Sequence, residues 1–520
     1  MSNNIFIDAK EAARIISDGD VVATGGFVGI GVPEEILIAI EEKFHQENSP
    51  KDLTIVYAAG QGDGKTKGLN HLAYEGLVKK VIGGHWGLAP RLGTLALENK
   101  IEGYNFPQGV LSHAFRDMAA GKKGTISKIG IGTFVDPKLE GGKINSITKE
   151  DLVTELDIDG DRHLYYKIPK LNVAILRGTS ADEDGNISLE KEALTLETLA
   201  IAMATKNSGG KVIVQVEKKV KRGSIDPKAA IVPGIFVDYI VICKDPKNHA
   251  QTFGTIFDEA FVNSSIVVEQ PKLTDIKLDE RKIIARRCAM FLNRDMRILN
   301  YGIGMPEGIA DVLRECGQEE HFTPTVEPGA IGGTPAGGLN FGASITPQAI
   351  IDQPYQFDFY DGGGLDATFL GLAQCDKDGN INVSKFGPKI AGCGGFINIS
   401  QNSKNVIFCG TFTAGGLKIE VKKGQLNIVT EGKNKKFINA VEQITFSGDT
   451  ANGNNQPVYY VTERAVFQLG KEGLILIEIA PGVDLKKDIL EQMEFEPIIS
   501  ENLKTMDWKI FDKEKFKLEL

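Results

Sequence analysis

A single carboxylate stands in a stretch of glycine and proline in the second half of the chain. Residues 322–344 read FTPTVEPGAIGGTPAGGLNFGAS, with six glycines, three prolines and Glu327 as the one ionisable side chain. The residues before Glu327 predict the end of a strand, and Pro328 and Gly329 cannot continue a strand or a helix. A glutamate at such a corner is an anion at neutral pH and a possible nucleophile. The other interpretation is a glutamate that caps its own turn.

A second candidate is a glutamine between proline and glycine in the first half. Gln108 lies in the run Asn105-Phe106-Pro107-Gln108-Gly109. Its amide could donate an N–H to a substrate oxygen, or it could fix its own loop, and the residues leave both interpretations open.

Metal and disulfide chemistry are not indicated. His71 and His85 lack a second His or Cys at ligand spacing, so both are interpreted as hydrogen-bonded structural histidines. The six cysteines include no C-x-x-C pair, which predicts buried free thiols. The D-x-D-G-N runs at residues 182–186 and 376–380 lack the further oxygen ligands of a calcium loop and predict hairpin turns.

Strand, glycine loop and helix follow one another twice in the chain. Residues 21–40 predict this order in the first half, and residues 297–313 predict it again in the second. The backbone of such a loop can face a ligand. The two copies match at a constant offset of 306 − 33 = 273, with Gly29, Ile30, Gly31, Pro33 and Glu34 corresponding to Gly302, Ile303, Gly304, Pro306 and Glu307.

A second matching pair supports a duplication. Each D-x-D-G-N run follows an apolar strand, and the two runs lie 379 − 185 = 194 residues apart. Since the glycine loops lie 273 residues apart, the first half carries 273 − 194 = 79 extra residues between its loop and its D-x-D-G-N run. We therefore expect an α/β protein of two homologous open halves, residues 1–270 and 286–520, with the active site at their seam. The junction lies near residues 245–285, which contain Pro246 and Pro271. When the halves are aligned, Ala58 falls opposite Glu327, so only the second half carries the nucleophile.

Charge and hydropathy exclude several classes of protein. The 520 residues carry a net charge of −10, which argues against nucleic acid as the main partner. No run of about 18 apolar residues predicts a membrane span, and the start of the chain has no signal-peptide pattern. We expect a cytoplasmic protein.

Taken together, these motifs resemble the family I coenzyme A transferases, in the acetate or propionate branch. The residues that carry the resemblance are Val326 to Gly333, similar to the E-x-G-x-x-G nucleophile motif, together with Gly25-Gly26-Phe27, Gly31-Val32-Pro33, Asn105 to Gly109 and Gly392-Cys393-Gly394-Gly395-Phe396. The likeness spans nearly the whole chain. Pro328 is a mild departure, because many relatives have a small residue there.

The resemblance implies a role for each motif. Glu327 would be the nucleophile, with Gln108 near the reacting carbonyl. Backbone beside coenzyme A (CoA) would come from Gly302, Gly304, Met305, Gly392, Gly394 and Gly395. CoA would be a substrate, with no metal and no tightly bound cofactor, and the protein would be a homodimer or homotetramer. The expected reaction moves CoA between a short-chain acyl-CoA and a free carboxylate such as acetate, through a glutamyl-CoA thioester.

Two rival functions remain open at the level of sequence. A thioesterase would use the same glutamate with water as the acceptor, and only the exclusion of water separates the two enzymes. A nucleotide-binding or sugar-phosphate-binding module would use the glycine loops alone. Gly26 to Gly31 match the dinucleotide-binding fingerprint weakly. An acid that binds a ribose should lie at the end of a strand, whereas Asp52 lies just before one.

Overall fold

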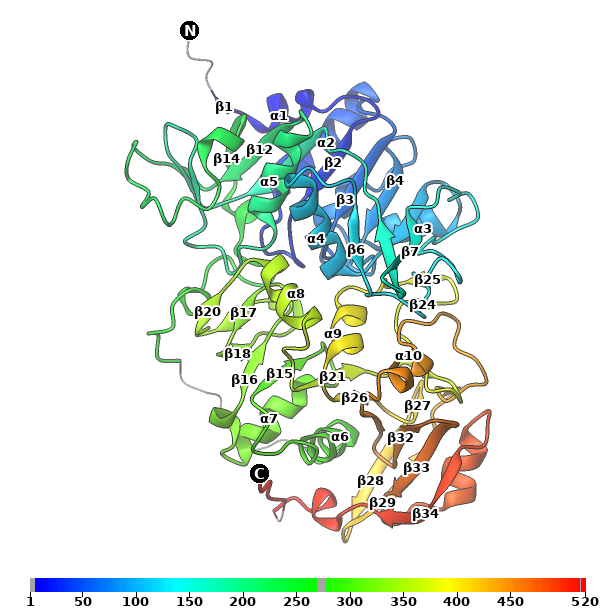
Figure 1. Ribbon diagram of the computed structural model, residues 1–520. Coiled ribbons are helices and arrows are strands. Elements are labelled where there is room, and N and C mark those ends of the chain that lie inside the picture. Colours follow the sequence, from blue (N-terminus) through cyan, green and yellow to red (C-terminus); the bar gives the residue numbers. More distant parts are fainter. Residues whose placement is uncertain (1–4, 269–276, 515) are drawn as a thin grey trace. The chain divides into compact units, whose positions relative to one another are not determined.

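The computed structural model (Figure 1) describes residues 5–268, 277–514 and 516–520. The chain forms two compact units. The first comprises Met1–Ile266, Val326–Asp358 and Lys385–Asn398, and the second comprises Val267–Thr325, Phe359–Ser384 and Ile399–Leu520. The compact units therefore cut across the two sequence repeats, and the segment that carries Glu327 belongs to the first unit. The repeat boundaries and the site at their seam stay predictions, and Pro271 lies outside the described residues.

A parallel sheet forms the centre of the first unit. Its order is β1-β14-β12-β9-β2-β3-β4-β5. The chain builds outward from β2 in one direction and from β9 in the other, so the neighbours β2 and β9 mark the switch point at which such sheets commonly bind ligands. The strands are β1 (Phe6–Ile7), β2 (Val21–Thr24), β3 (Leu53–Tyr57), β4 (Val78–Gly83), β5 (Glu102–Asn105), β9 (Val173–Arg177), β12 (Lys211–Val216) and β14 (Tyr239–Ile242).

Helices cover both faces of this sheet, because its central strands are apolar on both sides. All five residues of β9, VAILR, are buried, as expected for an interior parallel strand. One buried cluster joins alternate strand residues to α4 (Gln108–Ala119) and α5 (Thr198–Asn207). The other joins the remaining strand residues to α1 (Ala9–Ile15), α2 (Glu34–Glu47) and α3 (Pro90–Leu97).

Short antiparallel elements complete the first unit. A small sheet has the order β6-β8-β7, and three antiparallel pairs join β17 to β20, β18 to β19, and β24 to β25. Their bounds are β6 (Thr125–Ser127), β7 (Val153–Ile158), β8 (Asp161–Tyr166), β17 (Ala330–Ile331), β18 (Thr334–Pro335), β19 (Ser344–Ile345), β20 (Ala349–Ile350), β24 (Lys385–Phe386) and β25 (Lys389–Ile390).

The second unit repeats the same design. Its strands run β16-β15-β21-β26-β31 in parallel, and β32, β33 and β34 extend the sheet. Helices α6 (Glu280–Ala289) and α7 (Glu307–Glu315) pack on one buried cluster. The strands are β15 (Ile298–Tyr301), β16 (Thr323–Thr325), β21 (Ala367–Gly371), β26 (Val406–Cys409), β31 (Val458–Val461), β32 (Ala465–Gly470), β33 (Gly473–Ile479) and β34 (Ile498–Thr505).

The predicted duplication is confirmed by these elements. A glycine loop joins β2 to α2 in one half and β15 to α7 in the other. Both D-x-D-G-N runs close antiparallel hairpins, in which Asp182 and Asp376 accept hydrogen bonds from backbone N–H groups of their own turns. Helix α1 begins at Ala9, because Asp8 and Glu11 form a capping box.

Candidate active site

Glu327 projects from a tight corner that follows β16. The corner is closed by two backbone hydrogen bonds, from Val326 N to Ala330 O at 2.9 Å and from Gly329 N to Val326 O at 3.0 Å. Gly329 has φ +124°, and a Cβ atom there would collide with Ile351 O. The corner therefore requires glycine at this position, which agrees with the expected strand end and break.

The carboxyl group of Glu327 is held in an environment that favours its neutral form. The residue is half-buried, and burial raises its pKa to about 7. Among the described residues, the influences on this pKa are burial and the backbone of Glu327 itself, with no contribution from another side chain. A carboxylate without a partner cation and with a raised pKa is more basic, and so a better nucleophile once ionised, than a solvated glutamate.

A chain of hydrogen bonds leads from this corner to Gln108. Ile351 N donates to Gly329 O at 3.0 Å, and Gln353 follows two residues later. Gln108 Nε2 donates to Gln353 Oε1 at 3.2 Å, and Gln353 Nε2 donates to Ser112 Oγ at 2.6 Å. The structure thus links the two expected catalytic residues through the segment 351–353 of the first unit.

The loop at residues 392–395 lies against Gln108. Gln108 N donates to Gly394 O at 2.9 Å, and Gly394 N donates to Gly84 O at 2.7 Å. Gly392 and Gly394 both have positive φ, and Gly395 directly precedes α9 (Phe396–Asn402). Three of the expected CoA-side residues therefore gather at the first turn of α4.

The remaining expected CoA-side residues lie in the second unit. Gly302 follows β15 and donates its N–H to Phe369 O at 2.8 Å. Gly304 N donates to Glu307 Oε1 at 2.8 Å, and Met305 packs against the core of that unit. These contacts shape a glycine loop before α7, as expected from the sequence.

The prediction of a hydrogen-bonded structural histidine is confirmed for His71 and wrong for His85. His71 contacts the carboxylates of Glu34 and Glu41. His85 Nδ1 is closed off from solvent and has no hydrogen-bond partner among the described residues, and burial lowers the pKa of the ring to about 4. The sequence signal was present in Gly83-Gly84-His85-Trp86-Gly87, where glycines surround the imidazole on both sides.

A buried acid near the corner was missed by the sequence analysis. Glu197 is 1% exposed, and neither of its carboxyl oxygens has a hydrogen-bond partner among the described residues. Burial, with a smaller effect from Asp352, raises its pKa to about 8. The adjacent Leu196 O accepts a hydrogen bond from Gln353 N at 2.9 Å, so this acid borders the segment that joins Gly329 to Gln108. Nothing in the sequence around Glu197 distinguished it from a solvated acid.

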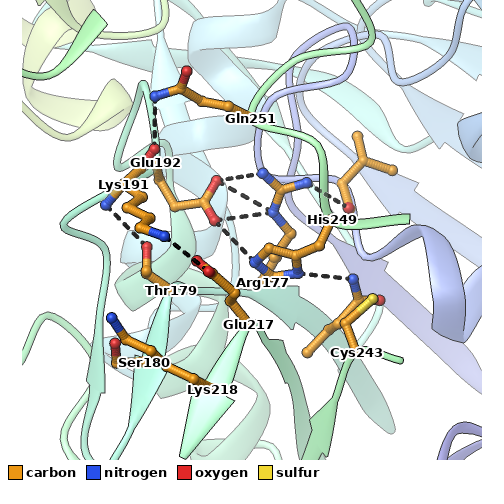
Figure 2. A network of polar contacts seen from close by, with 12 residues as sticks. Arg177, Thr179, Ser180, Lys191, Glu192, Glu217, Lys218, Cys243, His249 and Gln251 are labelled. Atoms are coloured by element: carbon orange, nitrogen blue, oxygen red, sulfur yellow. Dashed lines mark hydrogen bonds and ion pairs between the residues drawn. The ribbon is translucent and has the colours of Figure 1, made fainter. Parts of the chain in front are cut away.

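A polar network around Arg177 and Glu192 contacts the end of the first glycine loop (Figure 2). The Glu192 carboxylate accepts hydrogen bonds from Arg177 Nε and Nη2, while Arg177 Nη1 donates to Val32 O at 3.2 Å. His249 also lies beside this carboxylate, with its Nε2 3.6 Å from Glu192 Oε1. A cavity of about 240 Å³ opens beside these groups and is lined further by Lys191, Glu217 and Phe257. The network holds the start of α2 in place at the carboxyl end of β9.

Metal ligation receives no support within residues 5–268, 277–514 and 516–520, where no group of three His, Cys, Asp or Glu side chains could hold an ion. All six cysteines are free, and four of them are buried. Across the described part of the chain, every helix is too short or too polar to cross a membrane.

Comparison with known proteins agrees with this geometry. Residues 6–242 match the family model described as Coenzyme A transferase. The acetate CoA-transferase YdiF of Escherichia coli O157:H7 is 46% identical over 508 residues, covering 97% of this chain and 94% of that protein. The caffeate CoA-transferase of Acetobacterium woodii is 45% identical over 513 residues, covering 97% of each chain. A crystal structure of YdiF from E. coli O157:H7, as a thioester complex with CoA, superposes with a TM-score of 0.93 at 43% identity, covering 99% of this chain and 97% of that one.

The fold and the sequence together place the chain in the coenzyme A transferase family, among the family I enzymes. Within that family it is an acyl-CoA:carboxylate CoA-transferase of the acetate branch. CoA is accordingly carried by its substrates.

Proposed function

We propose that the enzyme moves CoA between a short-chain acyl-CoA and a free carboxylate such as acetate, in a ping-pong reaction through a glutamyl-CoA thioester on Glu327. The observation that carries this proposal is the half-buried Glu327 carboxyl at a glycine corner, with a pKa of about 7 and a hydrogen-bonded path to Gln108. The thioester complex of YdiF with CoA supports the covalent intermediate.

Each step of the reaction exchanges one bond at a carbonyl carbon. Glu327 Oε attacks the thioester carbonyl, a C–O bond forms, the C–S bond breaks, and CoA leaves as a thiolate. The thiolate then attacks the glutamyl carbonyl of the resulting anhydride, which releases the free carboxylate and leaves glutamyl-CoA. A second carboxylate runs the same steps in reverse. Both covalent species are hydrolysable, so the reaction requires that water be excluded.

Stabilisation of the tetrahedral intermediates would come from fixed donors. Gln108 is buried at the first turn of α4, where its side chain and the loop backbone meet a developing oxyanion without reorganisation. Backbone N–H groups of Gly392, Gly395 and Met305 would serve the same purpose on the CoA side. The N–H groups of Gly394, Gly302 and Gly304 already donate to Gly84 O, Phe369 O and Glu307 Oε1, so these glycines would instead let CoA approach the backbone closely. One such donor contributes about 3 kcal/mol to a transition state.

The choice of acids is inferred from relatives. YdiF and the protein of A. woodii bear the names of acetate and caffeate CoA-transferases, and this chain is similar to both along nearly its full length. We take acetate as one partner and a short-chain acyl-CoA as the other. A homodimer or homotetramer stays a prediction, which sedimentation equilibrium would test.

Intact-protein mass spectrometry tests the proposal directly. Wild-type protein mixed with acetyl-CoA or propionyl-CoA alone should gain the mass of one CoA less one water, and Glu327→Ala should gain nothing. Appearance of CoA and free acid without an adduct would instead identify a thioesterase. The absence of both adduct and product would contradict acyl-CoA chemistry at Glu327 altogether.

A further inference from the structure

His85 follows β4 and lies among three glycine-containing segments of the first unit. A Cβ atom built on Gly60 would lie 2.6 Å from His85 Nδ1, and one built on Gly87 would lie 3.1 Å from its Cε1. A Cβ atom built on Gly394 would lie 3.7 Å from both His85 Cδ2 and Gln108 Oε1. The absence of side chains at these glycines therefore leaves room for the imidazole beside Gln108.

The two nitrogens of the His85 ring differ in their access to a ligand. Nδ1 is closed off and has no partner among the described residues, whereas Nε2 belongs to the accessible side of a half-buried ring. The ring is neutral at physiological pH, because burial lowers its pKa to about 4, and it carries one N–H. A hydrogen on Nδ1 would be a buried donor without an acceptor, so the geometry favours the tautomer with its hydrogen on Nε2.

Packing connects this ring to the corner of the nucleophile. Ala59, which precedes Gly60, lies in one buried cluster with Val326 and Ala330, the residues that bracket the Glu327 turn. The hydrogen bond from Val28 N to Gly60 O, at 2.8 Å, fixes Gly60 against the first glycine loop. The segment that approaches His85 at Gly60 is thus packed, through Ala59, against the residues on either side of the Glu327 turn.

We propose that His85 is a further catalytic residue, whose Nε2–H donates a hydrogen bond to the carbonyl oxygen of the substrate thioester. This inference rests on the proposed role of Glu327. When Glu327 Oε attacks, the carbonyl π pair moves onto oxygen, and the hydrogen bond from His85 strengthens. The pair returns to the carbonyl when the C–S bond breaks and CoA leaves as a thiolate. The hydrogen stays on Nε2 throughout, and a neutral imidazole suits a role that needs a donor and no proton transfer.

The first test is the rate of glutamyl-CoA formation from acetyl-CoA, measured by rapid quench and mass spectrometry. Loss of one oxyanion donor lowers such a rate about 100-fold, so His85→Ala should form glutamyl-CoA about 100-fold more slowly than wild type, with little change in KM. His85→Gln keeps an N–H donor near the same position, so its rate should fall less. The matched control is His45→Gln, an exposed histidine near the end of α2, which should react like wild type.

The second test replaces the carbonyl oxygen. In the dithioester analogue of acetyl-CoA, sulfur takes the place of that oxygen and is a weak hydrogen-bond acceptor. Wild type should therefore discriminate against the analogue more strongly than His85→Ala or His85→Gln does. Because the comparison is a ratio within each variant, a general loss of folded protein does not affect it.

The outcomes separate this inference from the proposed function. If wild type forms no adduct, the proposed role of Glu327 fails. If wild type forms the adduct and Glu327→Ala does not, but His85→Ala reacts at the wild-type rate or shows the wild-type dithioester ratio, the role of His85 alone is overturned. Circular dichroism tests whether each variant is folded. If His85→Ala is not folded, the dithioester ratio of His85→Gln decides whether His85 is a donor.

Discussion

The side-chain amide of Gln108 donates to Gln353 Oε1 at 3.2 Å, and both residues are buried. Gln353 Nε2 in turn donates to Ser112 Oγ, whose hydroxyl donates to Gln108 O, so the three residues close a ring of hydrogen bonds. Only one of the two amide hydrogens of Gln108 is used in this ring. The ring shows that Gln108 fixes its own turn, and the second amide hydrogen, which lies outside the ring, leaves the proposed contact with a substrate oxygen possible in the same conformation.

Removal of Gln353 should therefore lower activity through Gln108. Gln353→Leu leaves the Gln108 amide free to rotate, and we expect a fall in kcat of roughly tenfold to a hundredfold, as for partial loss of an oxyanion donor. The control is Gln356→Leu one turn along α8 (Gln353–Asp361), because both amide atoms of Gln356 lack partners among the described residues. Equal activity of the two variants would show that the ring has no catalytic role.

The raised pKa of Glu327 predicts the pH dependence of the first half-reaction. The carboxyl group is protonated below its pKa of about 7, and the protonated form is a poor nucleophile. The rate of glutamyl-CoA formation should therefore fall about tenfold per pH unit below pH 7 and level off above it. Stopped-flow or rapid-quench measurements between pH 5 and pH 9 would show this limb, and a limb near pH 4.5 would contradict the effect of burial.

The turn at Gly329 should not accept a side chain. In Gly329→Ala, the new Cβ atom would displace Ile351 and with it the connection to Gln353, so adduct formation should fall sharply. Gly338→Ala is the matched control, since Gly338 has φ +61° and no atom within 4 Å of a Cβ position. Alanine at the φ of Gly338, in the left-handed region, costs about 1 kcal/mol, whereas Gly329→Ala has both the collision and the greater strain of φ +124°. Similar adduct formation in both would show that the corner tolerates movement.

Glu197 should destabilise the protein at neutral and alkaline pH. Its pKa is raised from 4.5 in the unfolded chain to about 8, so the folded state binds more protons between these values and stability falls as pH rises through that window. Glu197→Gln removes this decrease in the free energy of unfolding, which amounts to about 1.4 kcal/mol per pH unit between the two pKa values. Urea unfolding should show a stabilised variant at pH 8 and little difference near pH 4. Glu42→Gln, an exposed acid on α2, serves as the control and should be neutral at both pH values.

The regular elements were predictable because their patterns are local. The strand over residues 21–24 and the two glycine loops follow from apolar runs and from proline at the start of a helix, and the structure places them as expected. The duplication was also readable, since identical residues recur at fixed offsets. Glu327 stood out because it is the one ionisable side chain in its glycine stretch.

Local sequence patterns do not predict contacts between residues that are far apart in the chain. The contact between Gln108 and Gln353 joins residues 245 positions apart, and neither has a distinctive local sequence for such a pair. The sequence predicts a hydrogen-bonded His85, because the spacing of residues indicates metal ligands but does not indicate a ring nitrogen without a partner. Likewise, the burial of Glu197 depends on how α5 packs, and a sequence does not distinguish a buried acid from a solvated one.

A double-mutant cycle can measure how strongly the ion pair between Arg177 and Glu192 stabilises the protein near the first glycine loop, where Arg177 also donates to Val32 O. Both side chains are 2% exposed, and Arg177 and His249 lower the pKa of Glu192 to about 2 although burial acts in the opposite direction. Arg177→Met leaves a buried carboxylate unpaired and should destabilise the protein by about 3–5 kcal/mol, whereas the double variant Arg177→Met, Glu192→Met should cost clearly less than the sum of the single changes.

An exposed pair on the same cavity provides the comparison for that cycle. Lys191 and Glu217 lie 2.8 Å apart and are 39% and 40% exposed, so the corresponding cycle should give a coupling of about 1 kcal/mol or less. Urea unfolding of all six variants measures both couplings. Additive effects at Arg177 and Glu192 would mean that the pair does not hold the loop. Strong coupling together with a lower kcat in Arg177→Met, which also loses the hydrogen bond to Val32 O, would link this network to the position of the glycine loop during transfer.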